Sequence, residues 1–280
     1  MPTTRTVTSD ADHQGRGTRT VNGVSLYYEE RGSGPAILCV HGTGSSALVW
    51  APATPALARL GRVISYDRRG FARSGRPDPQ RPTSVAGHTD DAAALLDALG
   101  AAPAVVIGRS YGGYVAIDLA LRYPTHVRAL ALLEGVPESL DPEAERWVRG
   151  LVERTLAAGD RGPAAAAETL FREVLGNETW AELPEETRRA IIENGPAILS
   201  ELSGDFLLEV DPGDLARIDK PTLLVAATDS PPAFRRVHEK AVAAIPNARA
   251  ALVGGGHMVD PADPAVLAFV GEVLGRSRSS

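Results

Sequence analysis

The chain has 280 residues, of which 44% are hydrophobic, and this is enough for one sizeable core with an inserted subdomain. Its 29 basic and 35 acidic residues give a net charge of −6, and the basic residues are scattered, so nucleic acid is not expected as a partner. The sequence contains no run of about 18 apolar residues, so no membrane span is expected.

The N-terminal residues 1–17 are rich in Thr, Asp and Gly and have no apolar stretch of the kind that begins a secretory signal. We therefore expect a disordered leader and a cytoplasmic protein. The single cysteine, Cys39, lies in the apolar run AILCV, and Cys/His spacing typical of a metal site is absent. Neither a metal nor a cofactor is expected.

The rest of the chain alternates between short apolar runs and amphipathic segments. Residues 20–31 are typical of two strands joined by a tight turn at Asn22-Gly23. Six further runs are typical of strands in a buried parallel sheet, at residues 36–40, 62–67, 104–108, 127–135, 221–228 and 248–257. Helices are expected at residues 90–100, 113–124 and 263–275. This alternation predicts an α/β fold with a mostly parallel sheet flanked by helices.

The alternation is interrupted between residues 139 and 219. This stretch is typical of helices throughout, for example in PEAERWVRGLVERTLAAG and PAAAAETLFREVLG. A long helical insertion between two strands indicates a cap or lid. We therefore expect a core built from residues 18–138 and 220–280, with a helical cap at 139–219.

The segment Gly108-Arg109-Ser110-Tyr111-Gly112 matches Gly-x-Ser-x-Gly and lies between a predicted strand and a predicted helix. In this context the pattern predicts a sharp, strained turn that exposes the Ser110 hydroxyl at a helix N-terminus. The helix dipole and free backbone N–H groups there favour developing negative charge. Ser110 is therefore the candidate nucleophile.

From about Thr18 to Leu274 the chain resembles the α/β-hydrolase superfamily. The resemblance is carried by VHGTGSS, YDRRGFARSGRP, the serine turn and GGGHM before the last helix. The segments YDRRGFARSG and RYPTHVRALALLEG are most similar to the branch of esterases, lactonases and cofactor-free haloperoxidases. The resemblance implies the α/β-hydrolase fold and assigns the role of general base to His257, which follows three glycines.

A tetrahedral intermediate needs two N–H donors. Tyr111 follows the nucleophile and is expected to supply one backbone N–H. The loop HGTG is expected to supply the other from Thr43, with Gly42 as the alternative. His41 is expected to orient this loop. Arg109 is unusual before the nucleophile, and a buried ion pair is its simplest explanation.

Two carboxylates compete for the role of triad acid. The family usually places an aspartate after PTLLVAAT, but here that position holds Ser230, and Asp229 lies one residue early. Glu134 ends the apolar strand ALALLE. This resembles haloalkane dehalogenases and fungal-toxin lactonases, which carry their triad acid at this position. Because a carboxylate there is costly without a partner, and an imidazole N–H is a suitable partner, we favour Glu134 over Asp229.

The combined pattern predicts a serine hydrolase that cleaves a small apolar carboxylic ester or lactone, including a macrolactone such as a mycotoxin. A serine at position 110 argues against dehalogenases and epoxide hydrolases, which need aspartate there. Cofactor-free perhydrolysis, with peroxide in place of water, and a non-hydrolytic ligand-binding role remain as alternatives. Resemblance to the lid of mycotoxin lactonases points to Trp180 and Ile198 as substrate contacts.

Overall fold

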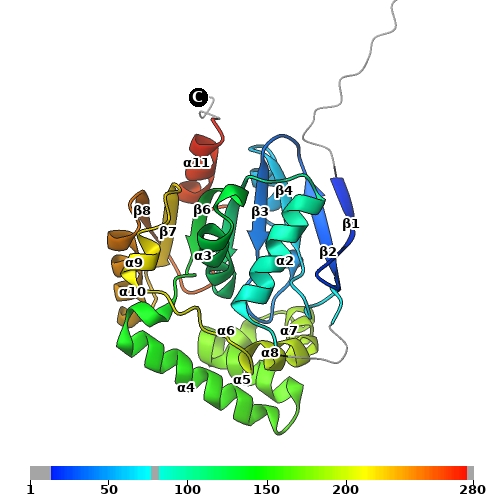
Figure 1. Ribbon diagram of the computed structural model, residues 1–280. Coiled ribbons are helices and arrows are strands. Elements are labelled where there is room, and N and C mark those ends of the chain that lie inside the picture. The colour runs from blue at the N-terminus through cyan, green and yellow to red at the C-terminus, as the bar shows by residue number, and fades with distance from the viewer. Residues whose placement is uncertain (1–13, 77–81, 276–280) are drawn as a thin grey trace, which may run out of the picture.

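The computed structural model describes residues 14–76 and 82–275. Within them, eight strands form one sheet in the order β1-β2-β4-β3-β5-β6-β7-β8 (Figure 1). The strands are β1 (Gln14–Val21), β2 (Val24–Arg31), β3 (Ala36–Val40), β4 (Arg62–Tyr66), β5 (Ala104–Arg109), β6 (Val127–Leu133), β7 (Thr222–Ala227) and β8 (Ala248–Val253). β2 pairs antiparallel with both β1 and β4, whereas β3 to β8 run parallel to one another. The predicted mostly parallel sheet is confirmed.

Helices cover both faces of the sheet, which is why the central strands are buried along their length and mostly apolar. All five residues of β3 and all six of β5 are buried. On one face, α2 (Val85–Ala98), α3 (Tyr111–Arg122) and α10 (Pro232–Ala244) enclose the larger core. On the other face, α1 (Thr54–Leu57) and α11 (Pro264–Val273) enclose a second one. Cys39 lies within that second core and is fully buried.

Between β6 and β7 the chain has a helical insertion. It contains α4 (Pro142–Gly159), α5 (Pro163–Leu175), α6 (Asn177–Glu182), α7 (Glu185–Glu193), α8 (Gly195–Leu202) and α9 (Pro212–Leu215). We call α4 to α8 the cap; its helices share a separate apolar core and lie together below the sheet in Figure 1. Asn194, between α7 and α8, accepts a hydrogen bond from the Ala72 N–H at 2.8 Å and donates one to the Gly44 carbonyl at 3.3 Å. The cap therefore packs on the loops that follow β3 and β4, at the carboxyl ends of the parallel strands.

Three boundaries differ clearly from expectation, and one is that of the last strand, β8, which ends at Val253 rather than at residue 257. β1 begins at Gln14, which pairs with Arg31 of β2. The disordered leader expected over residues 1–17 is therefore wrong for residues 14–17. Residues 1–13 lie outside the described residues. Main-chain pairing at the sheet edge, rather than an apolar pattern, orders this strand. α2 begins at Val85 rather than at residue 90, because the Ser84 side chain caps it by accepting a hydrogen bond from the Gly87 N–H.

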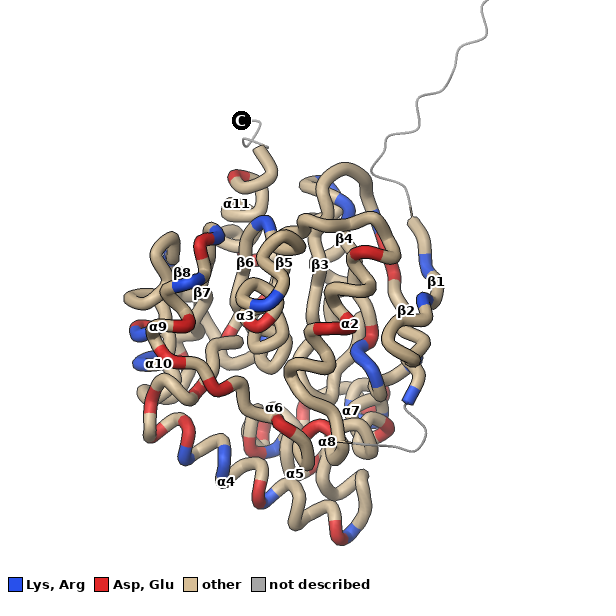
Figure 2. The backbone as a smooth tube through the Cα atoms, viewed as in Figure 1, with Lys and Arg blue, Asp and Glu red and all other residues tan. Residues whose placement is uncertain are grey.

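Charges of both signs are interspersed over the molecule, including along α4 (Figure 2). No helix in residues 14–76 and 82–275 is long and apolar enough to cross a membrane.

Candidate active site

Ser110 lies between β5 and α3 in a conformation that few non-glycine residues adopt. Its φ is +53° and its ψ −129°, and it directly precedes the first residue of α3. Its backbone N–H donates to the Leu133 carbonyl at 3.0 Å, which fixes the turn against β6. A Cβ atom at Gly108 would lie 2.3 Å from the Gly112 carbonyl oxygen, so the turn requires glycine there. Ser110 itself remains partly exposed.

Glu134 is the carboxylate that lies beside His257. The two side chains approach to 3.6 Å between Glu134 Oε2 and His257 Nδ1, an ion-pair distance slightly longer than a hydrogen bond. Glu134 Oε1 accepts a hydrogen bond from the Ala227 N–H at 2.7 Å. Burial raises the pKa of Glu134, but the His257 imidazole, the Ala227 N–H and Ser230 outweigh it, so the pKa lies below its ordinary value. The carboxylate therefore stays charged next to the imidazole.

Asp229, the alternative acid, has different surroundings. It is exposed, and its carboxylate accepts a hydrogen bond from the hydroxyl of its neighbour Thr228 at 3.0 Å. Its own N–H donates to the Gly255 carbonyl at 3.0 Å, which joins the β7 and β8 loops. The structure thus brings Glu134, and not Asp229, to the histidine.

The loop after β3 lies against the nucleophile. A Cβ atom added to Gly42 would be 3.0 Å from the Ser110 Cβ and 3.5 Å from its Oγ, so Gly42 and the peptide that follows it lie next to the serine. Tyr111 begins α3, and its ring stacks on Phe206 with centroids 5.1 Å apart, away from solvent. Within the described residues, the backbone N–H groups of Thr43 and Tyr111 donate no hydrogen bond to the protein. Tyr111 adjoins Ser110 in the chain, and the Thr43 N–H belongs to the peptide after Gly42, which contacts the serine.

Ser110 and His257 are not hydrogen-bonded to each other within the described residues. Nucleophile–base contacts in unliganded hydrolases are often long and tighten when substrate binds. His257 follows three glycines, Gly254 to Gly256, and at each of them an added Cβ would meet no atom within 4 Å. This open loop leaves room for the ring to adjust.

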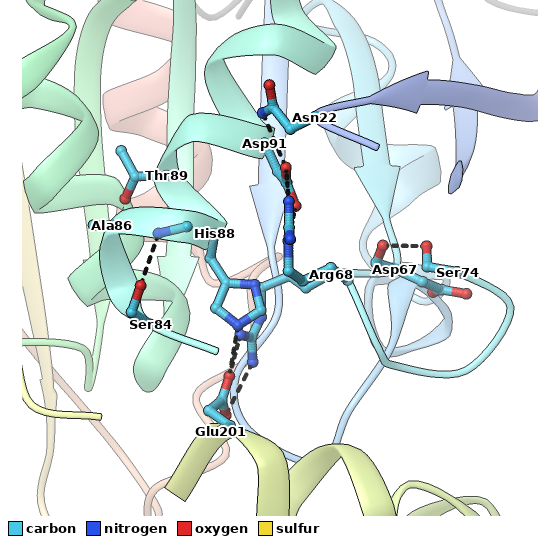
Figure 3. Close-up of polar contacts among 12 residues, drawn as sticks. Asn22, Asp67, Arg68, Ser74, Ser84, Ala86, His88, Thr89, Asp91 and Glu201 are labelled. Atoms are coloured by element: carbon cyan, nitrogen blue, oxygen red, sulfur yellow. Dashed lines mark hydrogen bonds and ion pairs between the residues drawn. The ribbon is translucent and has the colours of Figure 1, made fainter. Parts of the chain in front are cut away.

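A buried polar cluster that sequence reasoning missed joins the cap to the core (Figure 3). It consists of Arg68 after β4, His88 in α2, Thr43 after β3 and Glu201 in α8; we call it the Glu201 cluster. Glu201 is fully buried and forms an ion pair with Arg68, and its Oε1 lies 3.2 Å from His88 Nε2. Burial raises the pKa of Glu201, but the Arg68 charge and His88 outweigh it and lower the pKa to about 2. The lone acid in the apolar stretch AILSEL was the available signal.

Among the residues that the structure describes, Arg109 has no partner for the expected buried ion pair. Its guanidinium lies over the Trp50 ring at 5.6 Å and donates a weak hydrogen bond to the Val259 carbonyl at 3.5 Å. Burial lowers the pKa of Arg109 to about 10, which is still high enough to keep the charge at neutral pH. The side chain thus fills the space between the serine turn and the segment after His257.

Two further buried titratable groups flank Glu134. Glu138 accepts a hydrogen bond from the Tyr114 hydroxyl, and burial raises the pKa of Glu138 to about 7. Burial lowers the pKa of His238, which also interacts electrostatically with Glu134 and His257. Sequence reasoning did not single out Glu138.

The two predicted substrate contacts lie in the cap core. Ile198 is fully buried, and its Cδ1 would be 3.1 Å from a Cβ atom placed on Gly44, so it reaches the loop after β3. Trp180 is buried among cap residues and lies 6.2 Å from the Phe171 ring. In the described part of the chain, no group of three or more His, Cys, Asp or Glu side chains is arranged to hold a metal ion.

The fold and the serine turn are those of a class of hydrolases, and sequence comparison identifies this class as the α/β-hydrolase family. Residues 35–259 match the family described as the alpha/beta hydrolase fold, so the chain belongs to this family and is a hydrolase of the α/β-hydrolase type. It is 33% identical over 261 residues to a protein of Azorhizobium caulinodans provisionally named carbamate hydrolase RutD, covering 89% of this chain and 96% of that protein.

Solved structures agree in fold. A thermophilic esterase from Thermogutta terrifontis is 25% identical, with a TM-score of 0.74, covering 94% of this chain and 98% of the esterase. An enol-lactonase from Burkholderia xenovorans LB400 is 23% identical with a TM-score of 0.72, covering 93% of this chain and 99% of the lactonase, a likeness of fold alone.

Proposed function

We propose that this protein is a serine hydrolase that cleaves a small apolar carboxylic ester or lactone through an acyl-enzyme. The observation that carries the proposal is the strained Ser110 turn at the N-terminus of α3, with the Glu134–His257 pair at the same edge of the sheet. The 25% identity to a known esterase supports it. The proposal makes no use of a metal or cofactor.

In the first half-reaction, His257 takes the proton of the Ser110 hydroxyl while the serine oxygen attacks the substrate carbonyl carbon. The carbonyl oxygen becomes an oxyanion and receives hydrogen bonds from the N–H groups of Tyr111 and Thr43, with Gly42 as the alternative to Thr43. Collapse of the intermediate breaks the bond to the alkoxide, which leaves with the proton held by His257. A lactone would open at this step and stay attached to Ser110 through its acyl end.

In the second half-reaction, His257 takes a proton from water, and the hydroxide attacks the acyl carbon. The carboxylic acid leaves, and the proton returns to the Ser110 oxygen. Glu134 remains ionised throughout and stabilises the imidazolium that forms twice in the cycle. Its lowered pKa suits this role, because it keeps the carboxylate charged at neutral pH.

The cap, within the insertion at residues 139–219, would act as a lid whose apolar side chains select the substrate. The proximity of Ile198 and Phe171 to Gly44 supports this assignment, since a substrate acyl group at Ser110 must pass next to that loop. Trp180 would shape the lid from within its core rather than touch the substrate first.

The test is turnover of a panel of short-chain esters, aryl esters and lactones by wild type and by Ser110→Ala and His257→Ala variants. Each variant should lose roughly 10⁴-fold or more in kcat/KM while it stays folded, as judged by circular dichroism. No turnover of any member by wild type, or wild-type rates in folded Ser110→Ala, would contradict the proposal.

A further inference from the structure

We propose that Glu201, on cap helix α8, is a positioning residue that fixes the oxyanion loop His41–Gly44 by holding Thr43. The inference rests on the proposed function, because it gives Thr43 a backbone N–H that receives the oxyanion. It adds that the cap takes part in the chemical step and does not only admit substrate.

The first support is the geometry at Glu201 itself. Its Oε2 accepts a hydrogen bond from the Thr43 hydroxyl at 2.6 Å, and its Oε1 is paired with the Arg68 guanidinium and lies 3.2 Å from His88. With both oxygens engaged and the side chain fully buried, the carboxylate has one orientation. Figure 3 shows Arg68 and His88 converging on it from the core while Glu201 points up from α8.

The second support is that Arg68 holds the other end of the same loop. Its backbone N–H donates to His41 Nε2 at 2.9 Å, and its Nε donates to the His41 carbonyl at 3.0 Å. Its guanidinium lies 4.7 Å from the ring centroids of both Phe71 and Tyr111, and Tyr111 is the residue with the other proposed oxyanion donor. One ion pair therefore connects the surroundings of both donors.

The third support is the orientation of the peptide between Gly42 and Thr43. Because His41 Nε2 accepts the Arg68 N–H, the proton of the neutral ring is on Nδ1, which donates to the Gly42 carbonyl at 2.7 Å. Burial and the nearby Arg68 hold the pKa of His41 well below its ordinary value, so the ring stays neutral. In a planar trans peptide the Thr43 N–H points opposite to that carbonyl, so fixing the Gly42 oxygen and the Thr43 side chain fixes the donor.

Attachment of the cap is not a sufficient reason for this arrangement. Desolvation of a buried ion pair offsets most of its attraction, and apolar residues of similar volume often stabilise as well or better. The cap already has an apolar contact with the loop through Phe171 and Ile198 at Gly44. The hydrogen bond from the Thr43 hydroxyl to the Glu201 carboxylate also sets the orientation of Thr43, and an oxyanion donor needs a defined orientation.

The experiment compares Glu201→Gln and Thr43→Val with a matched control, Glu173→Gln. Glu173 forms an ion pair with Arg154 at 2.6 Å, also within the cap but at its surface. Steady-state kinetics on a short-chain ester give kcat and KM, and a trifluoromethyl ketone serves as a probe of the oxyanion site. Circular dichroism and thermal melting identify any variant that has failed to fold.

We expect Glu201→Gln and Thr43→Val each to lower kcat by roughly 10–100-fold with little change in KM. The reason is that the Thr43 N–H stabilises the oxyanion, which develops in the transition state and not in the bound substrate. The inhibition constant of the ketone should rise in parallel with the loss of kcat. Thr43→Ser keeps a hydroxyl for Glu201 and should recover most of the activity that Thr43→Val loses. Glu173→Gln should behave as wild type.

If the wild-type enzyme hydrolyses esters but folded Thr43→Val and Glu201→Gln both match Glu173→Gln in kcat and ketone inhibition, this inference is overturned and the proposed function is not. Should Glu201→Gln not fold, Thr43→Val alone decides the matter, because it leaves the Arg68–Glu201 ion pair in place. Inactive wild type overturns both proposals together.

Discussion

Residues Ser110 and Glu134 both have a positive φ angle, which is uncommon for non-glycine residues, and they follow adjacent strands. Their φ angles are +53° and +47°, and they are two of the four non-glycine residues with positive φ in the described chain. Such conformations cost free energy and persist where surrounding contacts enforce them. Here the Leu133 carbonyl holds the Ser110 N–H, and the Val225 carbonyl holds the Glu134 N–H, each at 3.0 Å. The strain thus falls on the proposed nucleophile and its acid.

The identity of the triad acid can be tested by a pair of substitutions. Glu134→Gln should lower kcat by roughly 10²–10⁴-fold with a modest change in KM, because the imidazolium loses its charged partner. Asp229→Asn should cost little, since Asp229 is exposed and its hydrogen bonds within the described residues are to Thr228 and the loop after β8. Kinetics should be measured where both variants are fully folded. The reverse pattern, with Asp229→Asn inactive and Glu134→Gln active, would move the acid to Asp229.

Single functional residues could be predicted from the sequence where they lie in a short local pattern. Ser110 lies in a five-residue pattern, and Glu134 was noticed because a carboxylate ends an apolar strand. The Arg68–Glu201 pair could not be predicted, because its members are 133 residues apart and only the fold brings them together. Arg109 was expected to have an ionic partner, yet an aromatic ring and a backbone carbonyl surround it.

Among the elements, α8 connects the cap to the core through a buried ion pair. Its Glu201 is fully buried, and removing the charge would leave Arg68 buried without a counter-ion. We predict that Glu201→Gln lowers the free energy of unfolding at neutral pH by about 3–5 kcal/mol, measured by urea denaturation. Glu173→Gln should change it by less than about 1 kcal/mol, since its ion pair lies at the surface.

The pH dependence has a defined sign. The pKa of Glu201 is lowered from 4.5 to about 2 in the folded protein, so its stabilisation is complete above pH 4.5 and is lost as the pH falls towards 2. The stability difference between wild type and Glu201→Gln should therefore shrink over that range. A difference that stays constant on acidification would show that the charge of Glu201 is not what stabilises the fold.

The elements themselves followed from periodicity to different degrees. The six apolar runs became β3 to β8, because strands in a sheet covered by helices on both faces are largely apolar, although the edge strand β8 is partly exposed. The strand expected before Asn22-Gly23 is β1, but its start at Gln14 was not predicted, because its sequence, QGRGTRTV, is polar and its order comes from pairing with β2. α2 began earlier than its apolar repeat, because a serine cap rather than hydrophobic spacing sets its start.

For the molecule as a whole, the fold places its chemistry at one end. The parallel strands end at the edge where the cap packs, and the loops after β3, β5, β6 and β8 carry Thr43, Ser110, Glu134 and His257 to that edge. Strand alternation predicted this arrangement, since ligands in open α/β sheets bind at the carboxyl ends of the strands. The substrate preference set by the cap depends on side chains of several helices, so no local sequence pattern predicts that preference.

The most direct test of the account is covalent labelling of the nucleophile. A fluorophosphonate reacts with a serine only where a base and an oxyanion site activate it. We predict one label per chain by intact-mass spectrometry, located on Ser110 by peptide mapping, absent in Ser110→Ala and slowed by roughly 10²-fold or more in His257→Ala. An esterase-active wild type that takes no label, or takes it at a residue other than Ser110, would contradict the central claim.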